Sequence, residues 1–339
     1  MAVTILAIES SCDDTSAAVV RDGHILSNLI AGQDIHMSYG GVVPELASRA
    51  HQANIVPVVD QALRRAGTDV EEIDAVAFTR GPGLLGSLLV GTSFAKGFAL
   101  AGDIPLIDVN HLQAHALVHF IPEKDGMTRL PEFPFLCLIV SGGHTRLIVM
   151  KNHLDMETIG NTIDDAAGEA FDKCGKLMDL PYPAGPLIDK LASRGNSKAF
   201  SFAKPKVKDL DFSFSGLKTA MLYLVRQRGQ KWAQENLADL CAAYQEAIVD
   251  VLKINTFTAV KNLHANKLVL AGGVAANSRL RQVFQEQADY YQIELIIPSL
   301  KYCTDNAAMI ARTGQEMLSR NQISPFSISA VPNLTLTTK

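Results

Sequence analysis

Two histidines, His111 and His115, are the residues whose type and spacing most directly suggest chemistry. They stand four positions apart, so on a helix both imidazoles point to one side and can ligate one metal ion. A zinc peptidase would carry a glutamate directly after the first histidine, where this chain has Leu112. A metal ion without such a base positions a ligand rather than activating water. The pair needs a further ligand, and we predict that Asp305 supplies it; a purely structural pair is the alternative.

Glycine-rich loops follow two predicted buried strands. Residues 141–144 read Ser-Gly-Gly-His after the strand 135–140, and Gly272-Gly273 follows the strand 267–271. Glycine lets backbone N–H groups approach a phosphate or carbonyl oxygen, and a helix N-terminus favours an anion. Both loops could therefore hold a nucleotide, although a hairpin turn and tight strand-to-helix packing would explain the same glycines.

Three carboxylates, Asp165, Glu169 and Asp172, occur at helical spacing in the segment 164–173. We predict that they line one helix face. Like charges at this spacing repel each other unless something binds them, and ribose hydroxyls would do so by donating hydrogen bonds. A solvated face is the alternative.

The elements around these motifs repeat about half a chain apart. A buried strand, a tight turn and a second strand occur at residues 4–20 and again at 135–150. Further on, apolar residues at helical spacing predict a helix over 237–252. Strand pairs followed by alternating helices and strands indicate an α/β fold built from a duplicated domain, against the alternative that two apolar hairpins look alike by chance.

Composition limits the class of protein. The chain has 339 residues, enough for two domains, with 47% hydrophobic and 19% charged residues, which excludes a disordered chain. The net charge of -4 gives no general attraction for nucleic acid, so action on RNA needs a local basic patch or a basic partner.

Five cysteines without a CxxC pair favour reduced thiols. The N-terminus does not read as a signal peptide, and the uncharged stretch 81–95 is shorter than a membrane span, so we expect a cytoplasmic enzyme.

Together these motifs resemble the universal family of tRNA threonylcarbamoyladenosine transferases, once described as O-sialoglycoprotein endopeptidases. The similarity covers nearly the full length and rests on residues 9–15, 39–49, 81–84, 111–115, 140–145, 164–173, 211–218, 271–277 and 303–306. It implies an actin/Hsp70/sugar-kinase (ASKHA) fold, with two duplicated RNase-H-like domains around a nucleotide cleft. We expect the first domain over residues 1–130, with 310–339 packing back on it, and the second over 131–309.

The resemblance also implies a reaction and its site. Threonylcarbamoyl would move from threonylcarbamoyl-AMP to N6 of adenosine 37, in tRNAs reading ANN codons. The family's metal ligands fall on His111, His115 and Asp305, and the metal is iron or zinc (Fe2+ or Zn2+). Its substrate contacts fall on Ile139, Val140, Ser141, Gly142, Gly143, Asp172, Gly185 and Asn277, and Asp189 matches an acidic position found in part of the family. Bacterial members work with a shorter paralogue of the same fold (TsaB-like) and a small P-loop ATPase (TsaE-like).

The mechanism we expect is acyl-type transfer, with the metal as Lewis acid and Asp13 as proton acceptor. Gln113 and Ala114 stand where Glu-Gly is frequent in the family, Ala184 replaces a frequent glycine, and Asp14 stands where Glu is common. None of these changes removes a predicted ligand, but Gln113 removes a carboxylate near the metal. The alternatives are a zinc-dependent glycoprotein endopeptidase, disfavoured by Leu112, and a nucleotide-gated scaffold without enzymatic activity.

Overall fold

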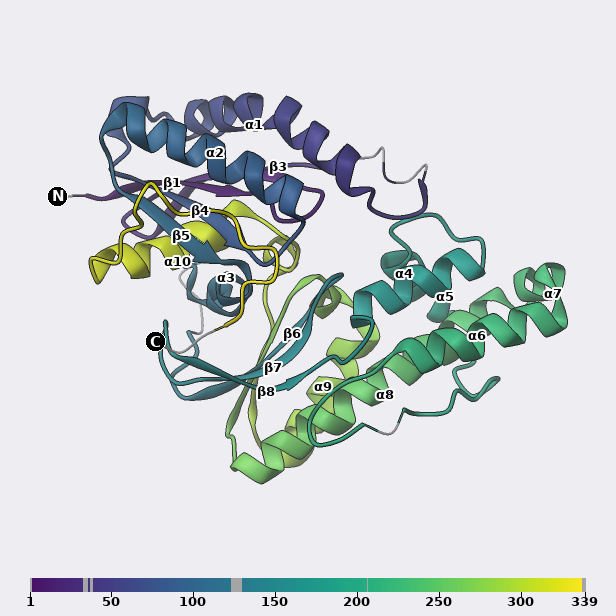
Figure 1. The fold of residues 1–339 in the computed structure, drawn as a ribbon. Helices are drawn as coiled ribbons and strands as arrows, with labels where there is room; N and C mark the ends of the chain where they lie inside the picture. Colours follow the sequence, from purple (N-terminus) through teal and green to yellow (C-terminus); the bar gives the residue numbers. More distant parts are fainter. Residues whose placement is uncertain (1, 33–35, 37–38, 123–129, 206, 337–339) are drawn as a thin grey trace. The chain divides into compact units, whose positions relative to one another are not determined.

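The chain folds into two compact units, each built around one five-stranded sheet (Figure 1). The computed structural model describes residues 2–32, 36, 39–122, 130–205 and 207–336. The first unit takes the described residues of 1–130, 152–155 and 305–339, and the second takes those of 131–151 and 156–304. The domain limits expected from the sequence stay a prediction.

The strands of the first unit have the order β3-β2-β1-β4-β5. They are β1 (Thr4–Glu9), β2 (Thr15–Arg21), β3 (His24–Ala31), β4 (Ala75–Gly81) and β5 (Leu106–Asn110). β1 pairs antiparallel with β2 and parallel with β4, which in turn pairs parallel with β5. Because parallel strands end at the same edge of a sheet, the loop after Glu9 and the helix that starts at His111 begin at one edge, with the end of β4 between them.

Helices cover both faces of this sheet (Figure 1). The unit contains α1 (Pro44–Ala66), η2 (Val70–Glu72), α2 (Leu85–Gly102), α3 (His111–Leu117), η3 (Val118–Phe120) and α10 (Ala307–Ser319). Leu6, Ile8 and Phe78 form a buried core with residues of α1 and α2. On the opposite face α10 packs closely, because a Cβ at Gly314 would lie only 2.6 Å from the Cβ of Ala77.

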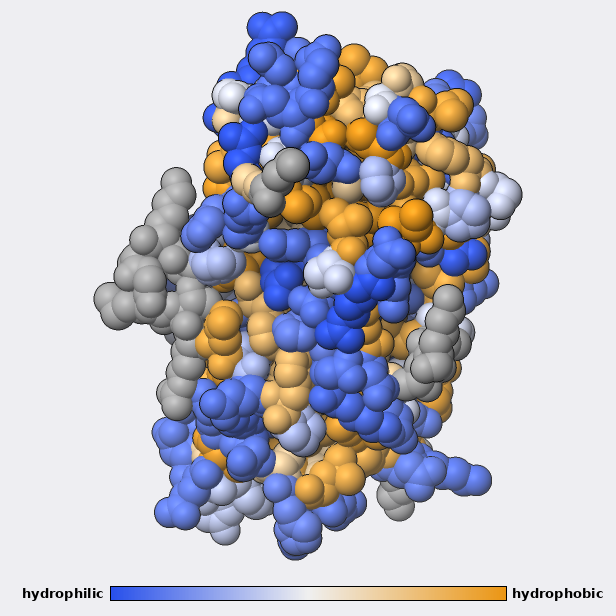
Figure 2. Space-filling view, turned by 90° about the vertical axis from the view of Figure 1, so that its left-hand side faces the viewer, coloured by the Kyte–Doolittle hydropathy of each residue, from blue (hydrophilic) through white to orange (hydrophobic). Residues whose placement is uncertain are grey.

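α2 is unusually apolar for a helix at the surface of a unit. Within the described residues it is the one helix whose length and composition would also allow it to cross a membrane, with a mean hydropathy of 1.3. A helix that packs on a core passes the same test, and α2 packs against β4 and α1. Leu85, Leu89 and Leu100 are nevertheless 44–69% exposed. Figure 2 shows hydrophobic residues reaching the surface in the upper part of that view.

The second unit repeats the strand arrangement of the first. Its strands are β6 (Phe135–Val140), β7 (Thr145–Met150), β8 (Met156–Asn161), β9 (Lys267–Ala271) and β10 (Glu294–Ile296). Their order is β8-β7-β6-β9-β10, with two antiparallel pairs followed by two parallel pairs, as in β3-β2-β1-β4-β5. The same order and directions in both sheets agree with the duplication predicted from the sequence, and the α/β class is confirmed.

The helices of the second unit bury one face of its sheet. They are α4 (Ala167–Leu177), α5 (Gly185–Ala192), α6 (Ser215–Arg228), α7 (Gln230–Glu235), α8 (Leu237–Leu263), η4 (Gly273–Ala276), α9 (Ser278–Tyr291) and η5 (Leu300–Tyr302). Leu136 and Leu138 of β6 pack in one core with Phe171 of α4 and Tyr244 of α8. The helix predicted over 237–252 begins at Leu237 as expected and continues eleven residues further, to Leu263.

Candidate functional site

The two histidines lie on α3, as their spacing predicts. The helix starts directly after β5, where the Asn110 side chain accepts hydrogen bonds from the backbone N–H groups of Leu112 (3.0 Å) and Gln113 (3.3 Å). This N-cap fixes the first turn of the helix, so His111 and His115 occupy consecutive turns on one side. Both histidines are buried, with 3% and 0% of the residue surface exposed.

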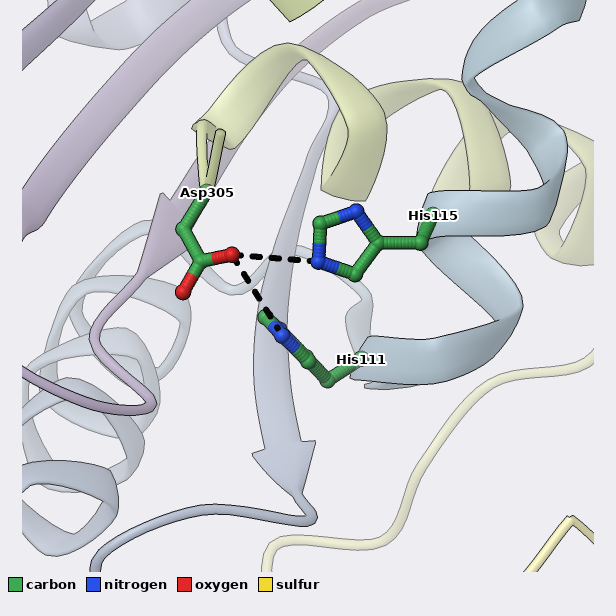
Figure 3. Close-up of side chains that lie close together, drawn as sticks. All are labelled: His111, His115 and Asp305. Carbon is green, nitrogen blue, oxygen red and sulfur yellow. Dashed lines mark hydrogen bonds and ion pairs between the residues drawn. The ribbon is translucent and has the colours of Figure 1, made fainter. Parts of the chain in front are cut away.

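Asp305 completes a cluster with the two histidines (Figure 3). Its Oδ1 atom lies 3.0 Å from His115 Nε2 and 3.6 Å from His111 Nε2, and the three candidate ligand atoms all lie within 4.8 Å of one another. Asp305 is placed by the residue that follows it, since Asn306 caps α10 by accepting from the backbone N–H of Met309. The structure therefore brings together the three residues predicted as metal ligands.

The donor set of this cluster fits a divalent transition metal. Two imidazole nitrogens and one carboxylate oxygen, which leave further coordination positions open, are typical of zinc and of non-haem iron sites. The Nδ1 atom of His115 is buried and has no hydrogen-bond partner among the described residues. Such an arrangement is costly unless the other ring nitrogen, Nε2, gains a strong interaction. The residues present can therefore hold one ion.

The charge state of His111 depends on carboxylates around it. Its Nδ1 atom lies 3.1 Å from Oε2 of Glu9, a buried residue at the end of β1. Burial alone would lower the pKa of His111, but the charges of Glu9 and Asp305 outweigh it and raise the pKa to about 9. A metal ion at this site must therefore displace a proton from His111 at neutral pH.

The loop after β1 brings further carboxylates near the cluster. Burial raises the pKa of Asp14 to about 7, and the charges of Asp13, Asp305 and Glu9 act in the same direction. The loop backbone is anchored at Cys12, whose carbonyl accepts hydrogen bonds from His51 Nε2 (3.0 Å) and from the Ser87 hydroxyl (2.9 Å). Asp13, the predicted proton acceptor, thus follows a fixed main-chain position, and its catalytic role stays a prediction.

Glu9 and His51 are the residues of this region that the sequence did not reveal as partners of the site. Glu9 is visible in the sequence as a charge at the end of an otherwise apolar strand, which signals a buried and paired carboxylate. His51 lies in an ordinary amphipathic stretch of α1. Only the fold shows that its Nδ1 atom lies 2.7 Å from the Thr15 hydroxyl.

In the second unit the Ser-Gly-Gly-His loop forms the turn between β6 and β7. The backbone N–H of Ser141 donates to the carbonyl of His144 (2.8 Å), and the Ser141 carbonyl accepts from Gly168 at the start of α4 (3.1 Å). A Cβ at Gly168 would lie 2.6 Å from that carbonyl, so glycine is required for this close approach. A Cβ at Gly142 or Gly143 would meet nothing within 4 Å. The turn is open on that side, as a ligand would require.

Two other predicted substrate contacts, Asp172 within α4 and Asp189 within α5, bind backbone N–H groups at the starts of helices in the same unit. Asp172 accepts from the backbone N–H of Ala184 (2.8 Å), directly before Gly185, the first residue of α5. Asp189 accepts from the backbone N–H and hydroxyl of Ser278, at 3.0 and 2.7 Å. Ile139 and Val140 are fully buried in β6. The role of all these residues in substrate binding stays a prediction.

Asn277 joins this group through its side chain. Its Oδ1 atom accepts from the backbone N–H of Leu280 (2.9 Å) and so caps α9, while its Nδ2 atom donates to Gln245 (2.8 Å). Through Ser278, its neighbour, the cap lies beside Asp189. The fold thus gathers two of the predicted contacts at the start of one helix.

The prediction of three carboxylates on one helix face is wrong. α4 begins at Ala167, so Asp165 precedes the helix. Its carboxylate is neutralised by Lys173 (2.6 Å) and Lys218 (3.0 Å), and Glu169 also pairs with Lys173 (2.8 Å). Lysines of the chain therefore relieve the repulsion between Asp165 and Glu169.

Comparison with known proteins gives a consistent result. Residues 24–312 match a family model, TsaD, described as tRNA N6-adenosine threonylcarbamoyltransferase. The chain is 57% identical to the protein of that name from Phocaeicola vulgatus, covering 93% of this chain and 94% of that one. It is 56% identical to the one from Porphyromonas gingivalis, covering 97% of each.

Solved structures with low sequence identity share the fold. HypF from T. kodakarensis is 13% identical with a TM-score of 0.62, over 94% of this chain and 47% of that one. The activator of 2-hydroxyisocaproyl-CoA dehydratase from Clostridium difficile is 14% identical with a TM-score of 0.52, over 95% and 97%. The predicted actin/Hsp70/sugar-kinase class is confirmed.

Proposed function

The chain belongs to the tRNA N6-adenosine threonylcarbamoyltransferase family, and on this premise we propose how its residues serve the transfer. It is an acyl-type transferase that modifies N6 of an adenosine in tRNA. We propose that the donor is threonylcarbamoyl-AMP and the acceptor adenosine 37 of tRNAs reading ANN codons. One observation supports this proposal above the others. The side chains of His111, His115 and Asp305 meet in a chain whose relatives are named as threonylcarbamoyltransferases.

The first unit is proposed to hold one Fe2+ or Zn2+ ion on these three side chains. When bound, the ion supplies Lewis-acid charge that polarises a donor oxygen. The chain itself argues against peptide hydrolysis at this site, because Leu112 occupies the place of a peptidase's general base and is fully buried.

Asp13 is proposed as the acceptor of the proton that leaves the adenosine amine. That amine is a weak nucleophile, since its lone pair is delocalised into the ring, so a positioned base and a fixed geometry must supply much of the rate. The anchored carbonyl of Cys12 gives Asp13 a defined backbone position. Replacing Asp13 with alanine should abolish transfer and leave binding of the adenylate nearly unchanged, as titration calorimetry would show. Unchanged turnover would remove Asp13 from the mechanism.

The second unit is proposed to bind the adenylate through the residues predicted as substrate contacts. The open turn at Ser141, Gly142 and Gly143 offers backbone groups to a phosphate or carbonyl oxygen. Four residues are proposed to contact the nucleoside: Gly185 and Asn277 at the starts of α5 and α9, and Asp172 and Asp189, whose carboxylates accept from backbone N–H groups beside those starts.

Partner proteins are part of the proposal. The acidic chain is proposed to work in the cytoplasm with a shorter paralogue of the same fold (TsaB-like) and a small P-loop ATPase (TsaE-like). An exposed apolar helix face supports a protein partner, because Leu85, Leu89 and Leu100 share one side of α2. Replacing Leu89 with glutamate should weaken co-purification with the paralogue and leave the chain folded.

One assay tests the function as a whole. The full-length chain, with its two partners, is incubated with tRNA and threonylcarbamoyl-AMP, with and without a chelator, and the tRNA nucleosides are identified by mass spectrometry. We expect modified adenosine that disappears with the chelator and returns with Fe2+ or Zn2+. If the chelator did not affect the modification, the proposed need for a metal ion would be wrong. Peptide cleavage without modified adenosine would contradict the proposed transferase activity.

A further inference from the structure

We propose that Glu9 is a positioning residue for His111: its carboxylate accepts a hydrogen bond from Nδ1–H of that imidazole and so directs Nε2 toward Asp305. The inference rests on the proposed metal centre. It adds to the three ligands a residue more than 100 positions away in sequence, at the end of the central strand of the first sheet.

The Glu9 carboxylate is buried and surrounded by donors. Only 1% of the residue is exposed. Its Oε1 atom accepts from the backbone N–H of Ser11 (2.6 Å), and its Oε2 atom accepts from the Thr79 hydroxyl (2.5 Å) and from His111 Nδ1 (3.1 Å). A buried carboxylate without such donors would be strongly destabilising. Among the described residues, its one ion-pair partner is His111.

This contact fixes the protonated nitrogen of His111. An ionised carboxylate can only accept, so the hydrogen lies on Nδ1. The carboxylate also accepts from the Ser11 backbone N–H and from the Thr79 hydroxyl, as an ionised group does. In the neutral imidazole Nε2 then carries the lone pair. This atom lies 3.6 Å from Asp305 Oδ1, the atom that His115 Nε2 also approaches.

The two histidines of the cluster differ in this respect. Nδ1 of His111 has Glu9 at 3.1 Å and the Ser11 hydroxyl at 3.3 Å. Nδ1 of His115 has no partner among the residues that the structure describes. Metal-binding imidazoles generally need an outer partner that sets tautomer and orientation, and losing it weakens metal binding. Glu9 therefore provides this support to one ligand only.

A purely structural role for Glu9 is the competing explanation, since Thr79 links it to β4. The variants Glu9→Gln and Thr79→Val separate the two. Glutamine keeps the shape of the side chain, but its amide can donate to Nδ1 and so favour the tautomer whose Nε2 cannot ligate. Valine removes one hydrogen bond to the same carboxylate without touching His111.

The measurement is Zn2+ affinity of the full-length chain by competition with a chromophoric chelator, together with the melting temperature of the chelated protein. We expect Glu9→Gln to bind Zn2+ about 10–100-fold more weakly, while Thr79→Val binds it as the wild type does. Equal affinity of Glu9→Gln and wild type would overturn the inference. If Thr79→Val lost as much affinity as Glu9→Gln, the role of Glu9 would be structural.

A second measurement uses the unmodified chain and does not depend on a variant that folds. Long-range proton–nitrogen NMR of the Zn2+-loaded protein reports the tautomer of each imidazole, and the signal absent from His111→Gln identifies His111. We expect a protonated Nδ1 and a ligated Nε2; ligation through Nδ1 would refute the inference. A wild-type chain that binds no Zn2+ would instead contradict the proposed metal centre itself.

Discussion

Two clusters of charged side chains, one in each unit, are built from similar residues and differ in how their charges are balanced. In the second unit Asp165 lies between Lys173 and Lys218, and Glu169 shares Lys173. In the first unit Glu9, Asp14 and Asp305 lie near one another, and the histidines His111 and His115 contact Glu9 and Asp305. The second cluster is neutralised by the chain. The first gathers negative charge that an external cation can balance.

The effects on pKa show the same difference. Burial would lower the pKa of Lys173, but hydrogen bonds to Asp165 and Glu169 outweigh it and raise the pKa. In the first unit, burial and like charges together raise the pKa of Asp14 to about 7. Carboxylates that are held near each other without lysine or arginine tend to mark function, whereas paired ones stabilise the fold.

The largest effect that tests this difference between the two clusters is expected from replacing Asp305. Replacing it with asparagine removes the charged ligand that both histidines approach. We expect loss of bound metal, measured by elemental analysis, and a decrease in transfer rate of about 10²–10³-fold, the size typical of losing one electrostatic contact in a transition state. A variant that keeps both its metal and its activity would show that the cluster is not the metal centre.

An intermediate effect is expected from pH, acting through Asp14. Its pKa is about 7 in the folded chain against 3.8 as the ordinary value, so the folded state binds more protons between these limits. The free energy of unfolding should therefore fall as pH rises from about 4 to about 7. In the variant Asp14→Asn this fall in the free energy of unfolding should be smaller than in the wild type. Because Asp14 is partly exposed, we expect a difference of only about 1–2 kcal/mol, in the chelated protein.

Urea unfolding at pH 5 and pH 8 measures this change, with and without Zn2+. The bound cation should lower the pKa of Asp14 and flatten the dependence on pH. If the wild type and Asp14→Asn lost equal stability between the two pH values, the raised pKa of Asp14 in the folded chain would be refuted.

The smallest effect is expected at Asp165. The variant Asp165→Asn removes one charge from a cluster whose lysine side chains are 33–39% exposed, and solvent weakens such pairs. We expect a loss of about 0.5–1 kcal/mol in the free energy of unfolding, measured in urea, and unchanged Zn2+ affinity. Loss of Zn2+ binding would show that the two clusters do not act separately.

Local periodicity was sufficient to predict the elements and part of the site. The apolar strand 135–140 and the helix starting at Leu237 lie where their patterns indicate. His111 and His115 share a helix side because their spacing is a property of the helix itself. The duplicated strand–turn–strand pattern likewise predicted two similar sheets. These features depend on neighbours within a few residues, and so the sequence alone determines them.

Contacts between distant residues were decided only by the tertiary structure. Glu9 meets His111 across 102 positions because β1 and β5 end at the same edge of a sheet. Lys218 meets Asp165 across 53 positions, which is why the sequence left those carboxylates without a protein partner. The charge of a residue is written in the sequence, but which opposite charge or ligand balances it depends on how the chain packs.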